Sequence, residues 1–504
     1  MSDPVPMRIS IRELMAASGV AFGTSGVRGL AASMTDLVCY ACSKGFLQYL
    51  EGIGELKRRG EAVLVAGDFR PSTDRVMEAV CRAAEDMSYR ALNCGKIPSP
   101  AVVLHGLEQK LPAIMVTGSH IPDDRNGIKF NKITGELLKD DEKGMTDQTI
   151  ELDDALFDAG GWFRKKISLP RPISTEAGEQ YIARYLDFFD RDALAGLRVG
   201  VYQHSAVGRD VLMTVVSSLG AEAVALGRSE KFIPVDTEAI RPEDAALAQA
   251  WAMGNRFDAI VSLDGDSDRP LVSDEKGYWL RGDVAGILCA RFLEADSVCT
   301  PVSCNTAVEK CGWFKQVLRT RIGSPYVVAA MLQASAAGGK LVVGYEANGG
   351  FLLNSDVERD GRQLRALPTR DAIIVVLSIL MMAQRLDKRI SELVAGLPAR
   401  STASDRLQNF APDKSRAILA RFNLGSLAAD KQAIESVFRP LCGTVTAIDR
   451  LDGLRITFAN DEIVHLRPSG NAPEFRCYTE AQTADRASAM NQTTLRLLMN
   501  LHAV

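Results

Sequence analysis

The chain has 504 residues, of which 46% are hydrophobic and 24% are charged, an ordinary balance for a globular protein. A single hydrophobic core stops growing at about 250 to 300 residues, so this length predicts three or four domains. The formal net charge of −4 provides no general electrostatic attraction to nucleic acid or to an anionic membrane, and we expect neither as a partner.

Segments that would indicate a membrane or an oxidising compartment are not evident. The longest strongly apolar run, 372–383, is too short to span a bilayer, and residues 1–14 do not follow a signal-peptide pattern. The ten cysteines have no framework spacing, and the CxxC pair Cys39 and Cys42 stands alone in a helix-like segment. We therefore expect a soluble, cytoplasmic protein with reduced, mostly buried thiols.

Short apolar runs alternate with longer amphipathic segments up to about residue 395. This alternation is typical of parallel or mixed sheets that are covered by helices on both faces. The predicted strands are 62–66, 113–116, 197–202, 258–263, 297–301 and 340–344. The predicted helices include 73–85, 178–189, 208–219 and 325–336.

The last hundred or so residues predict a different architecture, an antiparallel sheet with one helix packed on it. Its predicted elements are the strands 443–448, 454–458, 463–466 and 474–478 and the helix 485–501. Linker-like segments separate four predicted domains, 1–168, 169–281, 282–398 and 399–504. The predicted fold class is α/β, with three similar mixed α/β domains and a C-terminal α+β domain.

Two early segments are rich in small residues and end near an arginine. FGTSGVRG, 22–29, contains Arg28, and GDFRPST, 67–73, contains Arg70 and Ser72 just before a predicted helix. Either segment could bind phosphate, or it could serve only as a turn and a helix cap.

The segment TGSHIPDDRNGIKF, 117–130, carries a candidate nucleophile. Ser119 and His120 follow the predicted strand 113–116, and Lys129 lies further along the same segment. A hydroxyl at a strand end, beside an imidazole and within reach of cations, can be an activated nucleophile. By itself this signal is weak.

The segment DGDSDRP, 264–270, predicts a metal site after the strand 258–263. Asp264, Asp266 and Asp268 alternate along a loop, so their carboxylates can converge on a hard cation such as Mg²⁺. A calcium loop is a rival interpretation because Glu275 falls at its twelfth position, but Arg269 stands where that loop needs glycine. A solvated acidic turn is the remaining alternative.

The segment RPSGNAPEFR, 467–476, predicts a phosphate site. Arg467 can contact a phosphate through two N–H groups, and the turn that follows offers hydroxyl, amide and backbone N–H donors from Ser469, Gly470 and Asn471. A plain turn between two strands would use the same residue types.

The segment GYEANGGF, 344–351, is a predicted strand followed by a loop of small residues. Glu346 and Asn348 could hydrogen-bond vicinal hydroxyls, although the same residues also form ordinary turns. The isolated histidines elsewhere favour structural roles; they are His105, His204, His465 and His502.

Together these segments closely resemble the α-D-phosphohexomutase superfamily, especially its bacterial phosphomannomutase/phosphoglucomutase branch. FGTSGVRG, TGSHIPDDRNGIK, DGDSDR, GYEANGG and RPSGNAPEFR occur in the family's order over nearly the whole chain. The resemblance implies four domains around a central cleft. It also implies a mutase that interconverts hexose 6-phosphate and hexose 1-phosphate, most readily of mannose, with Mg²⁺ as cofactor and hexose 1,6-bisphosphate as activator.

The resemblance implies that Ser119 carries a phosphoryl group and, with the three aspartates, holds Mg²⁺. It assigns Lys129, His120 and Arg28 to the acid/base neighbourhood. A lysine must lose a proton to act as a base, so nearby positive charge that lowers the pKa of Lys129 would help.

The resemblance also implies the contacts to the small-molecule sugar phosphate. Arg269 would neutralise charge at the transferred group, and Glu346 and Asn348 would hold sugar hydroxyls. The phosphate that is not transferred would be bound by Arg467, Ser469, Gly470, Asn471 and Arg476.

The motifs depart from the family pattern at several positions. Ile121 stands where Asn is common, Asn348 where Ser is usual, Gly350 where His is often found, and residues 471–472 are Asn-Ala where Thr-Glu is common. These departures concern the substrate more than the reaction. A family carboxylate near the cleft would match Asp371 or Asp360.

Other functions stay open at this point. The nearest alternatives are a phosphoglucomutase and a phosphoglucosamine mutase. A metal-assisted sugar phosphatase would use the same serine but release free phosphate, and a non-catalytic sugar-phosphate-binding protein would turn nothing over. The sequence predicts no oligomeric state.

Overall fold

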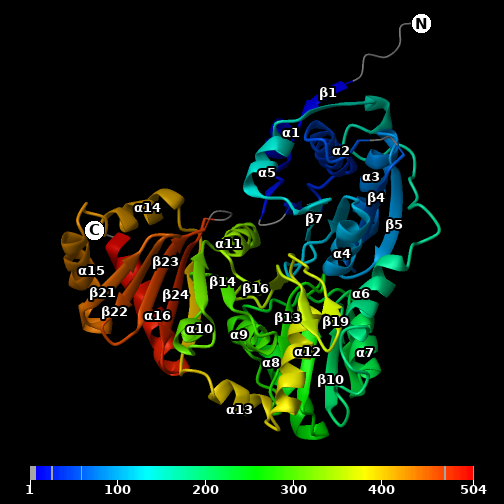
Figure 1. The fold of residues 1–504 in the computed structure, drawn as a ribbon. Helices are drawn as coiled ribbons and strands as arrows, with labels where there is room; N and C mark the ends of the chain where they lie inside the picture. Colours follow the sequence, from blue (N-terminus) through cyan, green and yellow to red (C-terminus); the bar gives the residue numbers. More distant parts are fainter. Residues whose placement is uncertain (1–6, 24–25, 58–59, 470–472, 503–504) are drawn as a thin grey trace, which may run out of the picture.

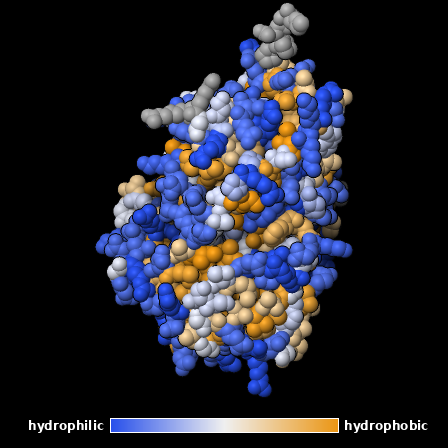
Figure 2. Space-filling model, turned by 90° about the vertical axis from the view of Figure 1, so that its right-hand side faces the viewer, coloured by the Kyte–Doolittle hydropathy of each residue, from blue (hydrophilic) through white to orange (hydrophobic). Residues whose placement is uncertain are grey.

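The computed structural model describes residues 7–23, 26–57, 60–469 and 473–502. The blue N-terminal part lies at the upper right of Figure 1 and the orange-to-red C-terminal part at the left, joined through the green and yellow part. Figure 2 shows hydrophilic residues over much of one face, with apolar residues in patches between them. Within the described ranges, no helix is long and apolar enough to cross a membrane.

Three sheets repeat one four-strand pattern, and we call the parts built on them the first, second and third units. The first sheet contains, in spatial order, β5 (Arg90–Lys96), β4 (Ala62–Gly67), β6 (Ala113–Val116) and β7 (Arg125–Lys132). The second contains β11 (Glu222–Arg228), β10 (Arg198–His204), β12 (Ala259–Leu263) and β13 (Pro270–Val272). The third contains β15 (Gln316–Thr320), β14 (Ser297–Pro301), β16 (Val342–Tyr345) and β17 (Phe351–Leu353).

Strand direction is also the same in the three sheets. The strand that comes first in the chain is parallel to both of its neighbours, and the fourth strand is antiparallel to the third. The loop between the third and fourth strands therefore leaves each sheet at an equivalent place.

The first unit has further strands. β3 (Gly26–Leu30) pairs with β7 and with β2 (Ala21–Phe22), while β8 (Gly135–Glu136) pairs with the other end of β7. A separate pair joins β1 (Met7–Ser10) to β9 (Thr149–Leu152). The short helical elements of this unit are α1 (Ile11–Ser18), α5 (Lys139–Thr146) and the 3₁₀ turn η1 (Asp154–Leu156).

Helices cover both faces of the first sheet, because both faces of its interior strand β4 are apolar. Val63 and Val65 of β4 share a buried core with α2 (Asp36–Gly52) and α3 (Thr73–Asp86). Leu64 and Ala66 point to the opposite face and pack with α4 (Ser99–Gln109). Such two-sided burial is typical of parallel strands.

The second and third units share one large hydrophobic core. The apolar run predicted for a core helix forms α12 (Ala372–Arg385), which packs on α9 (Gly282–Phe292) and reaches both sheets. The other helices of these units are α6 (Glu176–Leu186), α7 (Arg209–Ser218), α8 (Pro242–Asn255), α10 (Ala307–Lys310), α11 (Ser324–Ala336) and α13 (Ile390–Ala395). A hairpin of β18 (Val357–Arg359) and β19 (Arg362–Leu364) precedes α12.

The fourth domain is an antiparallel sheet with helices, as predicted. Its spatial strand order is β20 (Ser401–Leu407), β24 (Phe475–Ala481), β23 (Ile463–Pro468), β22 (Leu454–Phe458) and β21 (Val445–Asp449). Its helices are α14 (Pro412–Ala420), α15 (Leu427–Cys442) and α16 (Ala484–His502). The predicted fold class is confirmed, whereas the domain bounds inferred from linkers stay predictions.

Candidate active site

The three loops that join the third and fourth strands of the units carry most of the predicted chemistry. Ser119 and His120 follow β6, the aspartate loop 264–268 follows β12, and Glu346 and Asn348 follow β16. Residues of all three loops line one cleft of about 970 Å³, together with residues of β20 and β24 from the fourth domain. The repeated topology thus explains how segments distant in sequence meet.

Ser119 lies at the end of β6 in a strained backbone conformation. Its φ of 57° falls in the left-handed region that few residues other than glycine adopt. Its side chain is fully buried, and its hydroxyl donates a hydrogen bond of 2.6 Å to Oδ2 of Asp264. The Ser119 hydroxyl also lies 3.4 Å from Nδ1 of His120. The serine is therefore held against the aspartate loop.

Arg70 fixes the path of this serine loop. Its buried guanidinium donates to Asp68 and to four backbone carbonyl groups of the loop, those of Ser119, Ile121, Pro122 and Arg125. It also stacks over the ring of Phe232 from the second unit, 4.2 Å from the centroid. Of the two interpretations left open for GDFRPST, the contacts favour the structural one.

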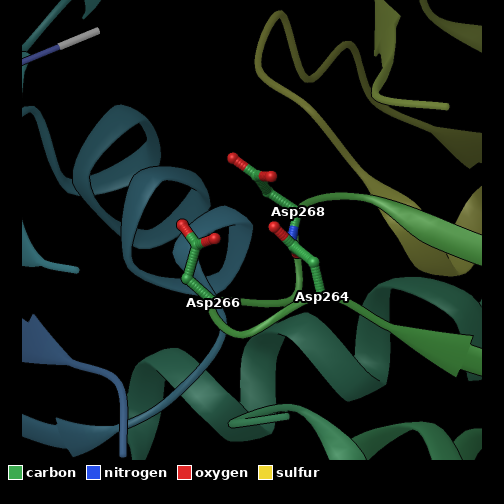
Figure 3. Close-up of side chains that lie close together, drawn as sticks. All are labelled: Asp264, Asp266 and Asp268. Atoms are coloured by element: carbon green, nitrogen blue, oxygen red, sulfur yellow. The ribbon is translucent and has the colours of Figure 1, made fainter. Parts of the chain in front are cut away.

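The three aspartates converge, as Figure 3 shows: their side chains project to the same side of one loop. One carboxylate oxygen from each lies within 4.8 Å of the others, and all three residues are buried. Oδ1 of Asp266 and Oδ1 of Asp268 have no hydrogen-bond partner. Buried carboxylate oxygens without donors suit a hard divalent cation, so this cluster could hold a metal.

The two alternatives to such a metal loop do not fit the geometry. A solvated acidic turn is wrong because Asp264 and Asp266 are 0% exposed and Asp268 is 3% exposed. In a calcium loop Glu275 would be a ligand, but its carboxylate instead accepts a hydrogen bond of 2.6 Å from the hydroxyl of Ser391.

Lys129, on β7, reaches into the aspartate cluster. Its Nζ donates to Oδ2 of Asp266 at 2.6 Å and to Oδ2 of Asp268 at 2.5 Å. Burial opposes the charge of Lys129, but the two carboxylates outweigh burial, and the net effect raises the pKa of this lysine. Nearby positive charge would help Lys129 to act as a base, but its closest partners in this structure are carboxylates.

His120 is surrounded by cations at the edge of the cleft. Nη1 of Arg269 lies 2.9 Å from Nδ1 of His120 and donates to it when the imidazole is neutral. Burial, Arg269 and Arg28 together lower the pKa of His120 well below its ordinary value. Burial and the neighbouring Arg269 also lower the pKa of the Arg28 guanidinium to about 10. The imidazole is therefore neutral at physiological pH.

The loop after β16 is tied to a residue that the motifs did not single out. Nε of Arg370 donates to Oε2 of Glu346 at 2.6 Å, and both side chains are buried although both residues line the cleft. The carbonyl oxygen of Asn348 accepts from the hydroxyl of Thr237 at 2.6 Å. Glu346 and Asn348 are thus fixed before any ligand is bound.

Asp371 points away from the cleft. Its carboxylate accepts hydrogen bonds from the hydroxyls of Tyr181 and Tyr185, at 2.8 and 2.5 Å, and caps the N-terminus of α12. Asp360, the other candidate carboxylate, lies in the exposed turn between β18 and β19. The cleft residue is instead Arg370. An aspartate directly before an apolar helix is a signal for a helix cap, and it favours this arrangement.

The phosphate segment belongs to a row of arginines on the fourth domain. Arg476 of β24 pairs directly with Arg467 of β23 on one side and with Arg406 of β20 on the other. Like charges directly opposite one another destabilise a sheet, so the row favours an anion at this surface. Arg476 and Arg406 line the cleft and form ion pairs with Glu474, at 3.3 and 3.2 Å. Arg467 forms an ion pair of 2.8 Å with Asp452.

Other members of the predicted phosphate segment are only partly described. The Ser469 backbone N–H donates to the carbonyl oxygen of Glu474 at 2.9 Å, which closes the turn. Gly470 and Asn471 lie outside the described residues. Arg406 was not predicted. Its place beside Arg476 follows from the register of two strands that are distant in sequence.

Family models match three parts of the chain. They are described as phosphoglucomutase/phosphomannomutase α/β/α domain I, at residues 19–155, domain II, at 179–277, and domain III, at 281–401. These ranges contain the three repeated sheets. The class that the fold and cleft define is therefore a mixed α/β protein built from three such units and an antiparallel fourth domain.

The chain belongs to the phosphoglucomutase/phosphomannomutase family of the α-D-phosphohexomutase superfamily. A phosphomannomutase of Salmonella muenchen is 43% identical over 95% of each chain. A phosphomannomutase of Sinorhizobium fredii is 42% identical over 95% of this chain and 99% of its own length.

Solved structures share the fold at low sequence identity. The open form of the phosphoglucomutase parafusin from Paramecium has a TM-score of 0.70 at 16% identity, over 95% of this chain and 94% of its own. The N-acetylphosphoglucosamine mutase of Aspergillus fumigatus, in complex with GlcNAc-6P and magnesium, has a TM-score of 0.59 at 15% identity, over 98% of this chain and 99% of its own.

Proposed function

We propose that the chain is a phosphohexomutase that interconverts mannose 6-phosphate and mannose 1-phosphate. The observation that carries this proposal is the hydroxyl of Ser119 at 2.6 Å from Asp264, in a buried carboxylate cluster. Its chain neighbours His120 and Arg269 line a cleft to which all four parts of the chain contribute. The relatives from Salmonella muenchen and Sinorhizobium fredii, at 43% and 42% identity, are both called phosphomannomutase, which favours mannose among the hexoses.

The metal proposed for the aspartate cluster is Mg²⁺. Asp264, Asp266 and Asp268 would hold it together with a phosphate oxygen on Ser119, and the Aspergillus structure was solved with magnesium. When bound, Mg²⁺ supplies positive charge that stabilises the transferring phosphoryl group. The unpartnered oxygens of Asp266 and Asp268 support this choice, because Mg²⁺ prefers oxygen ligands.

The proposed reaction has two phosphoryl transfers. In the first, the P–O bond to Ser119 breaks as a bond forms to a hydroxyl of the bound hexose phosphate. The hydroxyl proton passes into the neighbourhood of Lys129, His120 and Arg28, and the freed Ser119 oxygen takes up a proton to become a hydroxyl again. A bisphosphorylated sugar results. In the second, the sugar presents its other phosphate, which returns to Ser119. Hexose 1,6-bisphosphate would activate an enzyme that has lost its phosphoryl group.

The remaining site residues are proposed to bind and orient the sugar phosphate. Arg269, next to the serine loop, would contact the transferred group. Glu346 and Asn348 would hold sugar hydroxyls in either orientation of the substrate. The phosphate that is not transferred would be bound by Arg467, Ser469, Gly470, Asn471 and Arg476.

The test is ³¹P NMR of the purified chain with Mg²⁺, mannose 1-phosphate and a trace of mannose 1,6-bisphosphate. A growing 6-phosphate resonance without inorganic phosphate is the expected result. Inorganic phosphate instead would indicate a sugar phosphatase, and an unchanged spectrum would indicate a protein that only binds. Comparing kcat/KM for mannose, glucose and glucosamine phosphates then tests the proposed sugar.

A further inference from the structure

Cations and carboxylates lie close together around the aspartate cluster. Four cations surround the cluster, Arg28, Lys129, Arg269 and Arg370. They face four carboxylates, Asp264, Asp266, Asp268 and Glu346. Each α/β unit contributes an arginine to this set.

Among these four cations, Arg370 is the one contributed by the third unit. Its side chain is 3% exposed, yet it lines the cleft. Its Nε donates a hydrogen bond of 2.6 Å to Oε2 of Glu346, and its Nη1 lies 3.8 Å from Oδ2 of Asp268. The guanidinium therefore lies between Glu346, in the loop after β16, and Asp268, in the aspartate loop. A guanidinium can use one edge on a carboxylate and direct its other N–H groups to a phosphate.

The neighbours of Arg370 along the chain hold it in place. Thr369 donates a hydrogen bond of 2.6 Å to Glu136 of the first unit. Asp371 accepts hydrogen bonds from Tyr181 and Tyr185 of α6. Three consecutive buried residues are thus bonded to different parts of the molecule, which fixes the backbone from which Arg370 extends.

Gly350 leaves room for this arginine. A Cβ atom at position 350 would lie 2.5 Å from Cδ and 2.8 Å from Cγ of Arg370, far closer than carbon atoms approach without a shift. Arg370 can therefore take this position only because residue 350 has no side chain.

We propose that Arg370 is a phosphate-binding residue, that it contacts the phosphoryl group exchanged with Ser119, and that Gly350 is required to seat it. The proposal rests on the proposed mutase function. It differs from a role in which Arg370 merely orients Glu346 toward the sugar, and the two roles predict different ligand dependence.

The test measures ligand binding to the full chain in a Ser119→Ala background with Mg²⁺, so that nothing turns over. The ligands are mannose 1,6-bisphosphate, which fills both phosphate positions, and mannose 6-phosphate, which can leave the exchanged position empty. Both carry the same sugar. Arg370→Gln is expected to raise the Kd of the bisphosphate at least about tenfold more than that of the monophosphate, because a charged hydrogen bond to one phosphate is lost.

Three further variants make the result specific. Glu346→Gln, the control for a sugar contact, should weaken both ligands by similar factors. Arg370→Lys keeps the positive charge but loses the planar set of N–H donors of a guanidinium. This variant should retain part of the selectivity for the bisphosphate. Gly350→Ala should change the Kd values in the same way as Arg370→Gln. In a Gly350→Ala/Arg370→Ala double variant the Kd values should differ little from those of Arg370→Ala, because the side chain that the new Cβ would crowd is no longer there.

The outcomes separate this proposal from the function on which it rests. Equal weakening of both ligands by Arg370→Gln, or no weakening of either, overturns the phosphate contact while leaving the mutase assignment intact. Additive effects of Gly350→Ala and Arg370→Ala overturn the link between the two positions. A parent chain that binds neither ligand overturns the proposed function and this proposal together.

Discussion

The hydroxyl of Ser119 donates a 2.6 Å hydrogen bond to Asp264, a residue 145 positions later in the chain. The two loops approach closely because Gly265 follows the aspartate. A Cβ at Gly265 would lie 2.5 Å from the carbonyl oxygen of Ser119, so no side chain fits there. The nucleophile proposed on the first unit and the metal ligand proposed on the second are therefore brought together by the packing of two equivalent loops.

Replacing the proposed nucleophile should abolish mutase turnover. We expect Ser119→Ala to lower kcat by roughly a thousandfold or more, because no remaining group at this position can carry the phosphoryl. Steady-state kinetics with mannose 1-phosphate measures the effect. Ser88→Ala is the matched control: Ser88 is exposed, has a similar φ of 65° and should leave kcat unchanged. A Ser119→Ala variant with full activity would rule out the serine assignment.

Removing one carboxylate of the cluster should remove the dependence on metal. Asp266→Asn is expected to lower kcat/KM by roughly a hundredfold and to eliminate the rise in melting temperature that Mg²⁺ gives the parent chain. Asp258→Asn, at an exposed carboxylate just before β12, is the control and should behave like the parent. An Asp266→Asn variant that is still stabilised by Mg²⁺ would contradict the assignment.

Arg70 should act on folding rather than on phosphate binding. Arg70→Lys keeps a cation but loses the fork that holds four carbonyl groups of the serine loop. We expect a loss of about 3 kcal/mol in unfolding free energy, since buried acceptors lose a charged donor. Denaturant unfolding measures this loss. A fully stable variant whose KM for sugar phosphate has risen would instead favour a phosphate contact by Arg70.

Two buried histidines should make the fold sensitive to acid. Burial lowers the pKa of His204 and of His465 to about 4, whereas an unfolded histidine has a pKa near 6.5. The stability they provide is present above about pH 6.5 and is lost as the pH falls toward 4, by up to about 3 kcal/mol for each residue. Unfolding free energies measured between pH 7 and 4.5 should fall less steeply in a His204→Gln/His465→Gln variant. An identical slope would contradict the lowered pKa values.

Much of the architecture could be predicted from sequence because it depends on local patterns. The predicted strand 113–116 coincides with β6, and the predicted strand 454–458 coincides with β22. The strand that follows each site loop was harder to recognise. β7 contains Asn126, Gly127 and Lys129, which dilute the apolar pattern, and β13 and β17 are short.

What the sequence could not predict depends on contacts between distant segments. The partners that raise the pKa of Lys129, Asp266 and Asp268, come from another unit. Arg370 was missed because its neighbour Asp371 is a residue that would match a family carboxylate. The start of α12 instead turns that carboxylate toward Tyr181 and away from the cleft. The pairing of Arg406 with Arg476 depends on strand register, which the sequence alone does not specify.

The proposed mechanism is tested most directly by asking whether Ser119 itself carries the phosphoryl group. The dephosphorylated chain is incubated with Mg²⁺ and mannose 1,6-bisphosphate, and peptides are mapped by mass spectrometry. We expect one added phosphoryl group on the peptide that contains Ser119, with release of one mannose monophosphate per chain. Mutase turnover without phosphorylation of Ser119, or with phosphorylation of another residue, would contradict it.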